Sequence, residues 1–343
     1  MRKTAVFGLS VLLIVTAFWA CKPKAGGVAA KSQDLLSLLP QDVQGVLVID
    51  VQNGMKIETV ADFMNKAQEE EEFKEFIGKT GIDPRTDIRF LAVGLKMGGE
   101  KQEGVGVVNL DYDREALLAA MSKDGEVGKA DYKGVTIYTP PSDSEGEEEA
   151  EAEEMRIAFL DEANIAAGSP ALLEAVIDVF QGSQPGVTKN TELMPLVREA
   201  KKTSLVWGVF LVPAEALKET AGQVPMLGNM DAIQSVLMAI DYKNENVVME
   251  FKGKGTDEAK LKQIGDALTG IKGLGGMIAQ EKPEIGELLN KIEITSGKDF
   301  VMISAVLPEE LIKKLAAMAE EAAPKAEPEI FEEPTEELPP DLQ

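Results

Sequence analysis

The stretch from Val236 to Ile271 constrains the fold most, because its apolar residues follow the period of a strand and then that of a helix. Apolar side chains occupy alternate positions over 236–242 and 247–251, on either side of the polar turn Lys243–Asn246. Such spacing around a short polar turn predicts a β-hairpin. Thr256 then stands where a helix cap is expected, and the apolar residues that follow share one helical face: Leu261, Ile264, Ala267, Leu268 and Ile271.

The same hairpin–helix pattern recurs along the chain. It is predicted near residues 88–121, 155–181, 236–271 and 291–319. Two such units fall in each half, together with a further strand and helix, which suggests an ancient duplication. A single unit cannot bury its apolar faces, so we expect helices to cover one face of an antiparallel sheet in each half, an α+β fold. The irregular spacing of the units argues against a solenoid.

Other elements are predicted around these units. Residues 46–51 form a Val-rich run, which predicts a strand buried on both faces, and Asn53-Gly54 predicts a turn. Asp111 or Asp113 is expected to cap one helix, and Ser169 another. A single helix is predicted over 57–77, with an inner face made of Val60, Phe63, Met64, Ala67, Phe73, Phe76 and Ile77.

Composition divides the chain into five segments. They are predicted to be a signal peptide over 1–20, Cys21 with a flexible tether over 21–34, a first α+β half over 35–182, a second over 183–321, and a disordered acidic Pro/Glu tail over 322–343. The first half also contains an acidic low-complexity insertion, Ser142–Glu154, that is predicted to be a disordered loop.

The N-terminus predicts export. Arg2 and Lys3 precede a charge-free run over 5–20, which is shorter than the roughly 18 to 20 residues of a spanning helix. Small and polar residues come directly after the run, as in a signal peptide.

Ala20-Cys21 at the end of this run resembles the bacterial lipoprotein signal. In that family the Cys thiol is acylated and becomes the first mature residue, so the resemblance implies that Cys21 carries palmitate-type chains and anchors the protein in a bilayer. Phe18-Trp19 departs from the usual Leu followed by Ala or Ser. An ordinary cleaved signal and an uncleaved signal anchor are the alternatives. Lys22 stands where an Asp would imply inner-membrane retention, so the resemblance implies the outer membrane, facing the periplasm or the surface.

Two turn motifs carry a second resemblance. Leu39-Pro40-Gln41-Asp42 precedes the first strand, and Gly81-Ile82-Asp83-Pro84-Arg85-Thr86-Asp87-Ile88 precedes the first hairpin. Both are similar to motifs of uncharacterised exported bacterial proteins of unknown function. The resemblance implies a mixed α+β fold and no activity. Asp83 and Asp87 could be metal ligands, but turn residues leading into a strand are the simpler interpretation.

Composition narrows the chemistry. The chain has 35 Lys and Arg against 59 Asp and Glu, a net charge of −24, which argues against a nucleic-acid partner. There is no His and one Cys, which excludes a Ser-His-Asp triad and His- or Cys-cluster metal sites. Gly273, Gly275 and Gly276 form a Gly-rich patch, but no Lys-Ser/Thr follows as a phosphate loop requires. We therefore predict no catalytic residue, no cofactor and no metal.

Three classes of function remain. The first is a membrane-anchored envelope lipoprotein with a non-catalytic binding or scaffolding role, whose partners are the bilayer, through acylated Cys21, and an envelope protein. The second is a carrier of an apolar ligand or lipid. The third is a carboxylate-dependent hydrolase, although abundant acidic residues make any carboxylate pair uninformative. Trp207 and Phe210, near the middle of the chain, are expected in the core.

Overall fold

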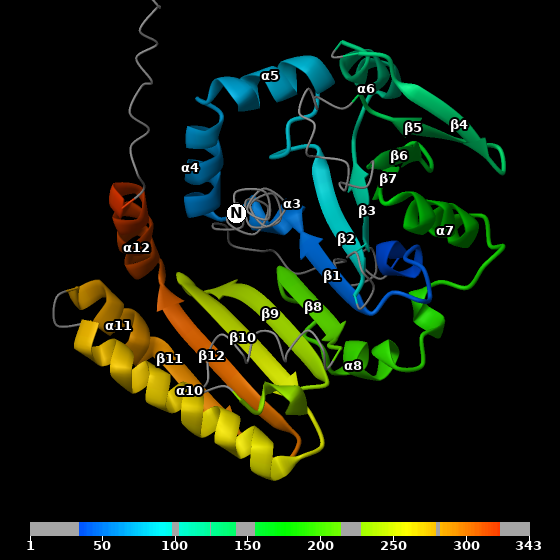
Figure 1. The fold of residues 1–343 in the computed structure, drawn as a ribbon. Coiled ribbons are helices and arrows are strands. Elements are labelled where there is room, and N and C mark those ends of the chain that lie inside the picture. Colours follow the sequence, from blue (N-terminus) through cyan, green and yellow to red (C-terminus); the bar gives the residue numbers. More distant parts are fainter. Residues whose placement is uncertain are drawn as a thin grey trace, which may run out of the picture.

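One antiparallel sheet runs through the computed structural model, which describes residues 34–97, 103–123, 125–141, 155–213, 228–278 and 282–322 (Figure 1). Within these residues the sheet has twelve strands. Their order is β11 (Ile292–Ser296), β12 (Phe300–Pro308), β10 (Asn246–Lys254), β9 (Ser235–Lys243), β8 (Val206–Leu211), β1 (Gly45–Asp50), β2 (Ile88–Lys96), β3 (Glu103–Leu110), β7 (Asn164–Gly168), β6 (Arg156–Phe159), β5 (Val135–Thr139) and β4 (Gly128–Tyr132). Together with the helices it makes the fold α+β, as the sequence predicts.

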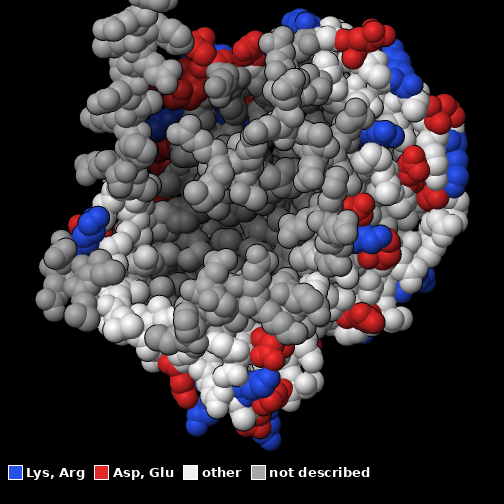
Figure 2. All heavy atoms as spheres, in the orientation of Figure 1, with Lys and Arg blue, Asp and Glu red and all other residues white. Residues whose placement is uncertain are grey.

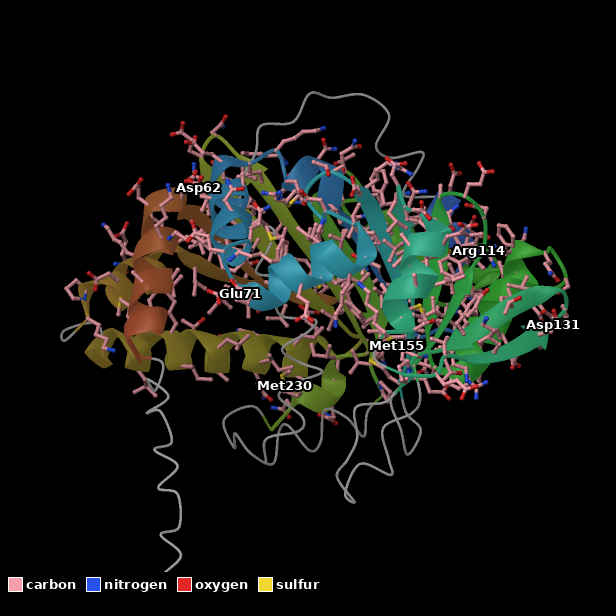
Figure 3. All side chains as sticks on the ribbon, turned by 90° about the horizontal axis from the view of Figure 1, so that it is seen from above. Asp62, Glu71, Arg114, Asp131, Met155 and Met230 are labelled. Carbon is pink, nitrogen blue, oxygen red and sulfur yellow. The ribbon has the colours of Figure 1, made fainter. Side chains whose placement is uncertain are left out.

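The two halves of the chain meet at the pair β1–β8. Val46 lies opposite Val209 and Val48 opposite Trp207 in this antiparallel pair. All six residues of β1 are buried, which confirms the prediction of a strand buried on both faces. On the right of the view in Figure 2, Lys and Arg side chains are interspersed with Asp and Glu over the described surface. Seen from above, Asp131 of β4 lies at one end of the molecule, opposite the C-terminal helices (Figure 3).

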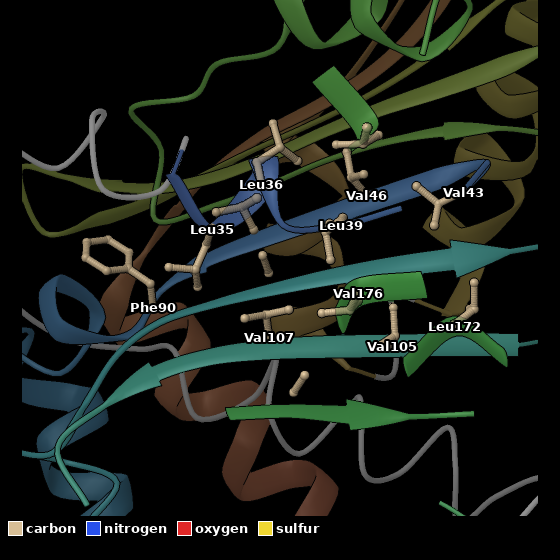
Figure 4. Close-up of a cluster of buried hydrophobic side chains, with 14 of the residues drawn as sticks. Leu35, Leu36, Leu39, Val43, Val46, Phe90, Val105, Val107, Leu172 and Val176 are labelled. Carbon is tan, nitrogen blue, oxygen red and sulfur yellow. The ribbon is translucent and has the colours of Figure 1, made fainter. Parts of the chain in front are cut away.

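Because side chains alternate along a strand, each face of the sheet can be followed from β1 outward. We call the face that carries Val46 and Val48 the core face, and the one that carries Leu47 and Ile49 the open face. Around the centre of the sheet the core face is covered by the segment Leu35–Leu39 and helix α7 (Pro170–Phe180) of the first half, and by α8 (Leu193–Glu199) of the second half, which packs on β8. Figure 4 shows part of this cluster, including Leu36, Val46 and Leu172. This is the largest apolar cluster among the described residues.

The open face is covered at both ends of the sheet. In the second half, α10 (Glu258–Ile278), α11 (Pro283–Lys291) and α12 (Glu309–Ala322) pack on it through clusters that include Leu261, Ile264, Leu311 and Ile312. In the first half, α6 (Arg114–Met121) lies over it beside Phe159. The expectation that helices cover one face in each half is therefore wrong. In the first half α7 and α6 lie on opposite faces, and in the second half α8 covers the core face at β8 while α10, α11 and α12 cover the open face of the sheet. The central strands are apolar on both faces, so both faces require cover.

Two local predictions on the open-face side are wrong. Asn53-Gly54 is not a turn but the end of a short helix, α3 (Val51–Gly54), because the Asp50 carboxylate accepts hydrogen bonds from the Asn53 backbone and amide nitrogens at 3.0 and 2.7 Å. The helix predicted over 57–77 is two helices, α4 (Glu58–Ala67) and α5 (Glu71–Thr80). The break places Glu71 at the start of a new helix, where the dipole favours acidic residues, rather than at the C-terminal end of the old one.

The break also changes which aromatic residues face inward. Phe63 and Phe76 are 39% and 43% exposed, so the prediction that they belong to an inner face is wrong. Val60 and Met64 of α4 are buried, as predicted, together with Ile57 directly before the helix, and Phe73 of α5 packs against them.

Helix caps are confirmed in part. Asp113, one of the two expected residues, caps α6 by accepting from the Glu115 and Ala116 amides. Ser169 lies at the cap position of α7, but its hydroxyl makes no capping bond. Asp257, and not Thr256, accepts from an amide of the first turn of α10, because it stands one residue nearer to the helix.

Several predictions lie outside the described residues. They concern the signal peptide, Cys21 and the tether as far as residue 33, the acidic insertion over 142–154, and the tail after residue 322.

Candidate functional site

The middle of the open face carries a row of apolar side chains across five adjacent strands. Strand pairing aligns Leu91 and Val93 of β2 with Leu47 and Ile49 of β1. The row continues through β8 to Met238 of β9 and then to its partner on β10. We call this set the apolar face: Leu47, Leu91, Val93, Phe210, Met238 and Phe251.

On β2 and β9 the apolar face is less buried than the core face of the same strands, whereas β1 is buried on both faces. On the core face, Val46, Ala92 and Val209 are each 0% exposed. On the apolar face, Phe251 is 38% exposed, and Leu91, Val93, Phe210 and Met238 are half-buried. The helices that cover the ends of the open face thus leave its centre partly accessible.

The chemistry of this face is restricted to apolar contacts. Its side chains contain no hydrogen-bonding or charged group. Its five strands each have a neighbour on both sides, so their backbone groups are committed to the sheet. A peptide laid on this face would leave its own backbone polar groups without partners, at a cost of a few kcal/mol each. A hydrocarbon chain carries no such cost.

One end of the apolar face is closed by a polar contact between the two halves. Glu309, the first residue of α12, accepts hydrogen bonds from the Tyr242 hydroxyl at 2.5 Å and from the Thr59 hydroxyl of α4. Lys313 pairs with the same carboxylate at 3.0 Å. Burial alone would raise the pKa of Glu309, but the bonds from Tyr242 and Lys313 hold that pKa below its ordinary value.

A surface pocket of about 680 Å³ opens beside this contact. Its lining includes Lys56, Glu58, Glu245, Glu309 and Glu310. A smaller pocket of about 430 Å³ lies between α10 and the β11–β12 turn and is also lined mainly by polar residues. Neither pocket is built for an apolar ligand.

The Asp83–Asp87 motif is a structural turn. The Asp87 carboxylate accepts from the Asp83 amide at 2.7 Å, and the Arg85 guanidinium pairs with Asp83 at 2.6 Å. The hydrogen bond from Arg85 lowers the pKa of Asp83. Arg85 also donates to Asn65 and Gln68, so the motif fastens the end of α4 to the start of β2. The described residues contain no group of three or more His, Cys, Asp and Glu that could hold a metal ion.

The other singled-out residues have structural positions. The Gly-rich patch lies within α10, where a Cβ on Gly275 would stand 2.9 Å from a methyl carbon of Leu289. The absence of a side chain at Gly275 therefore lets α10 and α11 pack closely against each other. Trp207 is in the core at 1% exposure, as predicted, but Phe210 is half-buried on the apolar face. The sequence analysis did not predict this face. The apolar residues on both sides of β1 and β2 could have indicated it.

No protein-family profile matches the chain, and no curated protein matches it. Among solved structures, crystal forms I, III and IV of TP0453 are similar, with TM-scores of 0.44, 0.47 and 0.44 and identities of 11%, 10% and 11%. They cover 83%, 87% and 85% of this chain and 97%, 100% and 100% of those chains. No helix among the described residues is long and apolar enough to cross a membrane.

Proposed function

We propose that the protein is an envelope lipoprotein, anchored in the outer membrane through acylated Cys21, with a non-catalytic binding role. The lipoprotein-type signal supports the anchor. The apolar face supports the binding role, because it presents only apolar side chains and no free backbone group. In this proposal the folded part holds an apolar ligand, or an envelope partner, at the membrane.

The anchor is tested with the full chain expressed in a bacterial host and labelled palmitate. We expect the wild type to take up label, to partition into detergent and to sediment with the outer membrane. Cys21→Ser should abolish labelling and release the protein. A Cys21→Ser chain that stays fully membrane-bound would contradict the anchor and leave an uncleaved signal.

The apolar face favours one of the binding roles, that of a carrier for a lipid or other apolar ligand. Its partly accessible side chains are aliphatic, aromatic or Met, and its strands offer no free backbone group. Binding sites for small apolar ligands are lined predominantly by such side chains. The observation that carries this proposal is the contrast on β2 and β9, where core-face side chains are buried and the side chains of the apolar face are half-buried.

A matched pair of variants tests the carrier role. Phe251→Glu places a charge on the apolar face, and Val306→Glu places one on the opposite face of the same sheet, where Val306 is 51% exposed. With a fluorescent fatty acid as probe, we expect Phe251→Glu to weaken binding at least tenfold and Val306→Glu to leave it within twofold. Circular dichroism checks that both variants fold. No binding by the wild type, or equal loss in both variants, would contradict the carrier role.

We also propose that the two halves arose by duplication. The orders β1-β2-β3-β7-β6 and β8-β9-β10-β12-β11 support it, since each runs outward from the centre in the same sequence of strands. Helix α7 follows the last strand of the first half and α12 the last strand of the second. They lie on opposite faces of the sheet, so a duplication requires that one of them moved to the other face. Superposing the five strands of each half tests this origin, because strands that match only out of register would contradict it.

A further inference from the structure

The strand β4 leaves its outer edge unpaired by any described strand. It is the last strand of the sheet, and Gly128, Lys129, Ala130 and Asp131 are all exposed. Figure 3 shows Asp131 at the outer end of the molecule. An edge strand presents backbone donors and acceptors to any further strand.

The hairpin geometry determines which backbone groups point outward. Tyr132 and Val135 flank a two-residue turn, in which Lys133 and Gly134 have φ of 53° and 82°. The residues that flank such a turn bond to each other, and the bonding then alternates along the strand. Tyr132, Ala130 and Gly128 therefore bond to β5. The N–H and C=O groups of Lys129 and Asp131 point outward, and no described residue bonds to them.

The opposite edge of the sheet, strand β11, has an outward backbone group that is hydrogen-bonded within the same molecule. On β11 the same alternation, counted from the Gly297–Phe300 bond, directs the backbone of Ile292 outward. Its carbonyl accepts a hydrogen bond from the Lys272 ammonium of α10 at 2.6 Å. Within the described part of the chain, one edge is thus partly capped by a side chain of the same molecule, whereas the other is bare.

We propose that β4 pairs edge to edge with β4 of a second copy of this chain, about a two-fold axis at Ala130. An antiparallel pair in this register places Lys129 opposite Asp131 of the second copy, twice. These are also the residues with outward backbone groups, so they form the hydrogen-bonded pairs of the ladder. Opposite charges directly across an antiparallel pair stabilise it.

The remaining positions of this register also fit. Gly128 lies opposite Tyr132 of the second copy, and a position without a side chain leaves room for the Tyr132 ring, which packs on the core cluster of its own chain and donates a hydrogen bond to Asp178 at 3.4 Å. Ala130 lies opposite itself, in a pair without hydrogen bonds where small side chains meet closely. The Lys129 ammonium lies 6.0 Å from the Tyr138 ring centre, and Asp131 accepts from Gly134 in its own turn. Both charged groups stay exposed.

This interface is small, so we expect a weak dimer that salt disrupts. The first test is a charge-swap cycle on the full chain, with the dissociation constant measured by analytical ultracentrifugation. Lys129→Asp alone and Asp131→Lys alone should each weaken the dimer at least tenfold, because like charges then face each other. The double variant Lys129→Asp with Asp131→Lys should restore it, since opposite charges face each other again. A dimer that withstands both single reversals would overturn this interface.

A second test locates the two-fold axis. In the Cys21→Ser background, Ala130→Cys should form an intermolecular disulfide on mild oxidation, because the Cα atoms of such a pair lie about 4.5 Å apart. Thr136→Cys, on the inner strand β5, is the matched control and should stay reduced. No cross-link at Ala130, together with a monomeric wild type at the highest concentration reached, would overturn the proposal.

Discussion

At the scale of single residues, the Glu309 carboxylate accepts hydrogen bonds from two different parts of the fold. It receives bonds from Thr59 of α4 and Tyr242 of β9, so one carboxylate links the first half, the sheet and α12. Glu309→Gln keeps the shape of the side chain but removes its charge. We expect a loss of about 1–3 kcal/mol in the free energy of unfolding at pH 7, the usual range for hydrogen bonds to a charged group.

The pH dependence of stability distinguishes the loss of this charged contact from a nonspecific effect of the substitution. Because the folded-state pKa of Glu309 lies below its ordinary value, its contribution is complete above the unfolded-state pKa. It is lost as the pH falls through the folded-state pKa. Chemical denaturation should therefore show wild type and Glu309→Gln converging below about pH 4. Glu310→Gln, an exposed neighbour in the same first turn, removes the same charge without these hydrogen bonds and should cost less than about 1 kcal/mol. Equal effects of the two variants would contradict this role of Glu309.

Gly168 shows how closely two strands can approach. A Cβ at this position would lie 2.4 Å from the Gly104 carbonyl oxygen and 2.6 Å from the Val105 Cα, so the backbone would have to move. Gly168→Ala should cost about 1–3 kcal/mol, as overpacking in a core does. Gly106→Ala on the facing strand has its nearest neighbour at 3.5 Å and should cost little. Urea denaturation of the two variants measures the difference, and equal costs would contradict the account.

At the scale of elements, the cap of α6 distinguishes between the two residues that the sequence offered. Asp113 caps the helix, whereas Asp111 pairs with Arg89 at 2.6 Å. Asp113→Ala should lower stability by about 1 kcal/mol, while Asp113→Asn should retain most of it because Asn also caps well. Thermal denaturation checks both. An Asn variant as unstable as the Ala variant would indicate a role for the charge rather than for the cap.

Sequence patterns predicted those elements whose apolar residues follow a single period, either that of a strand or that of a helix. The hairpin β9–β10 alternates clearly, and its turn residues Asn244 and Glu245 adopt φ of 52° and 61°, as a two-residue hairpin requires. Strand β4 was missed because Gly128, Lys129, Ala130 and Asp131 carry no β-type pattern. The division of α4 from α5 was missed because apolar spacing continues through the break.

The candidate site was harder to predict than the fold. Alternation shows that a strand such as β1 has apolar residues on both faces, but it does not show which face helices cover. That depends on where α6, α7 and α10 pack, and on pairs such as β1–β8 between residues far apart in the chain. Those contacts are set by tertiary packing, which local periodicity does not encode.

At the scale of the whole molecule, one sheet joins both halves. The core cluster combines Val46 and Val48 of β1 with Trp207 and Val209 of β8. If either half unfolded, the core residues of the other half would be exposed to water. We therefore expect one cooperative unfolding transition. Far-ultraviolet circular dichroism and the fluorescence of Trp207 should change together in denaturant. Two separated transitions would show that the halves are independent.

The position of β8 at the centre of the sheet also has a consequence for biosynthesis. Strand β1 can pair with β2 early, but its other neighbour begins only at Val206. Throughout the intervening translation and export, the nascent chain carries a strand with four consecutive apolar residues, 46–49, and one edge unpaired, a form prone to self-association. We expect chains that stop before Val206 to aggregate or to be held by chaperones, whereas the full chain stays dispersed. Soluble yields of a truncation series would measure this, and a short chain as soluble as the full one would contradict it.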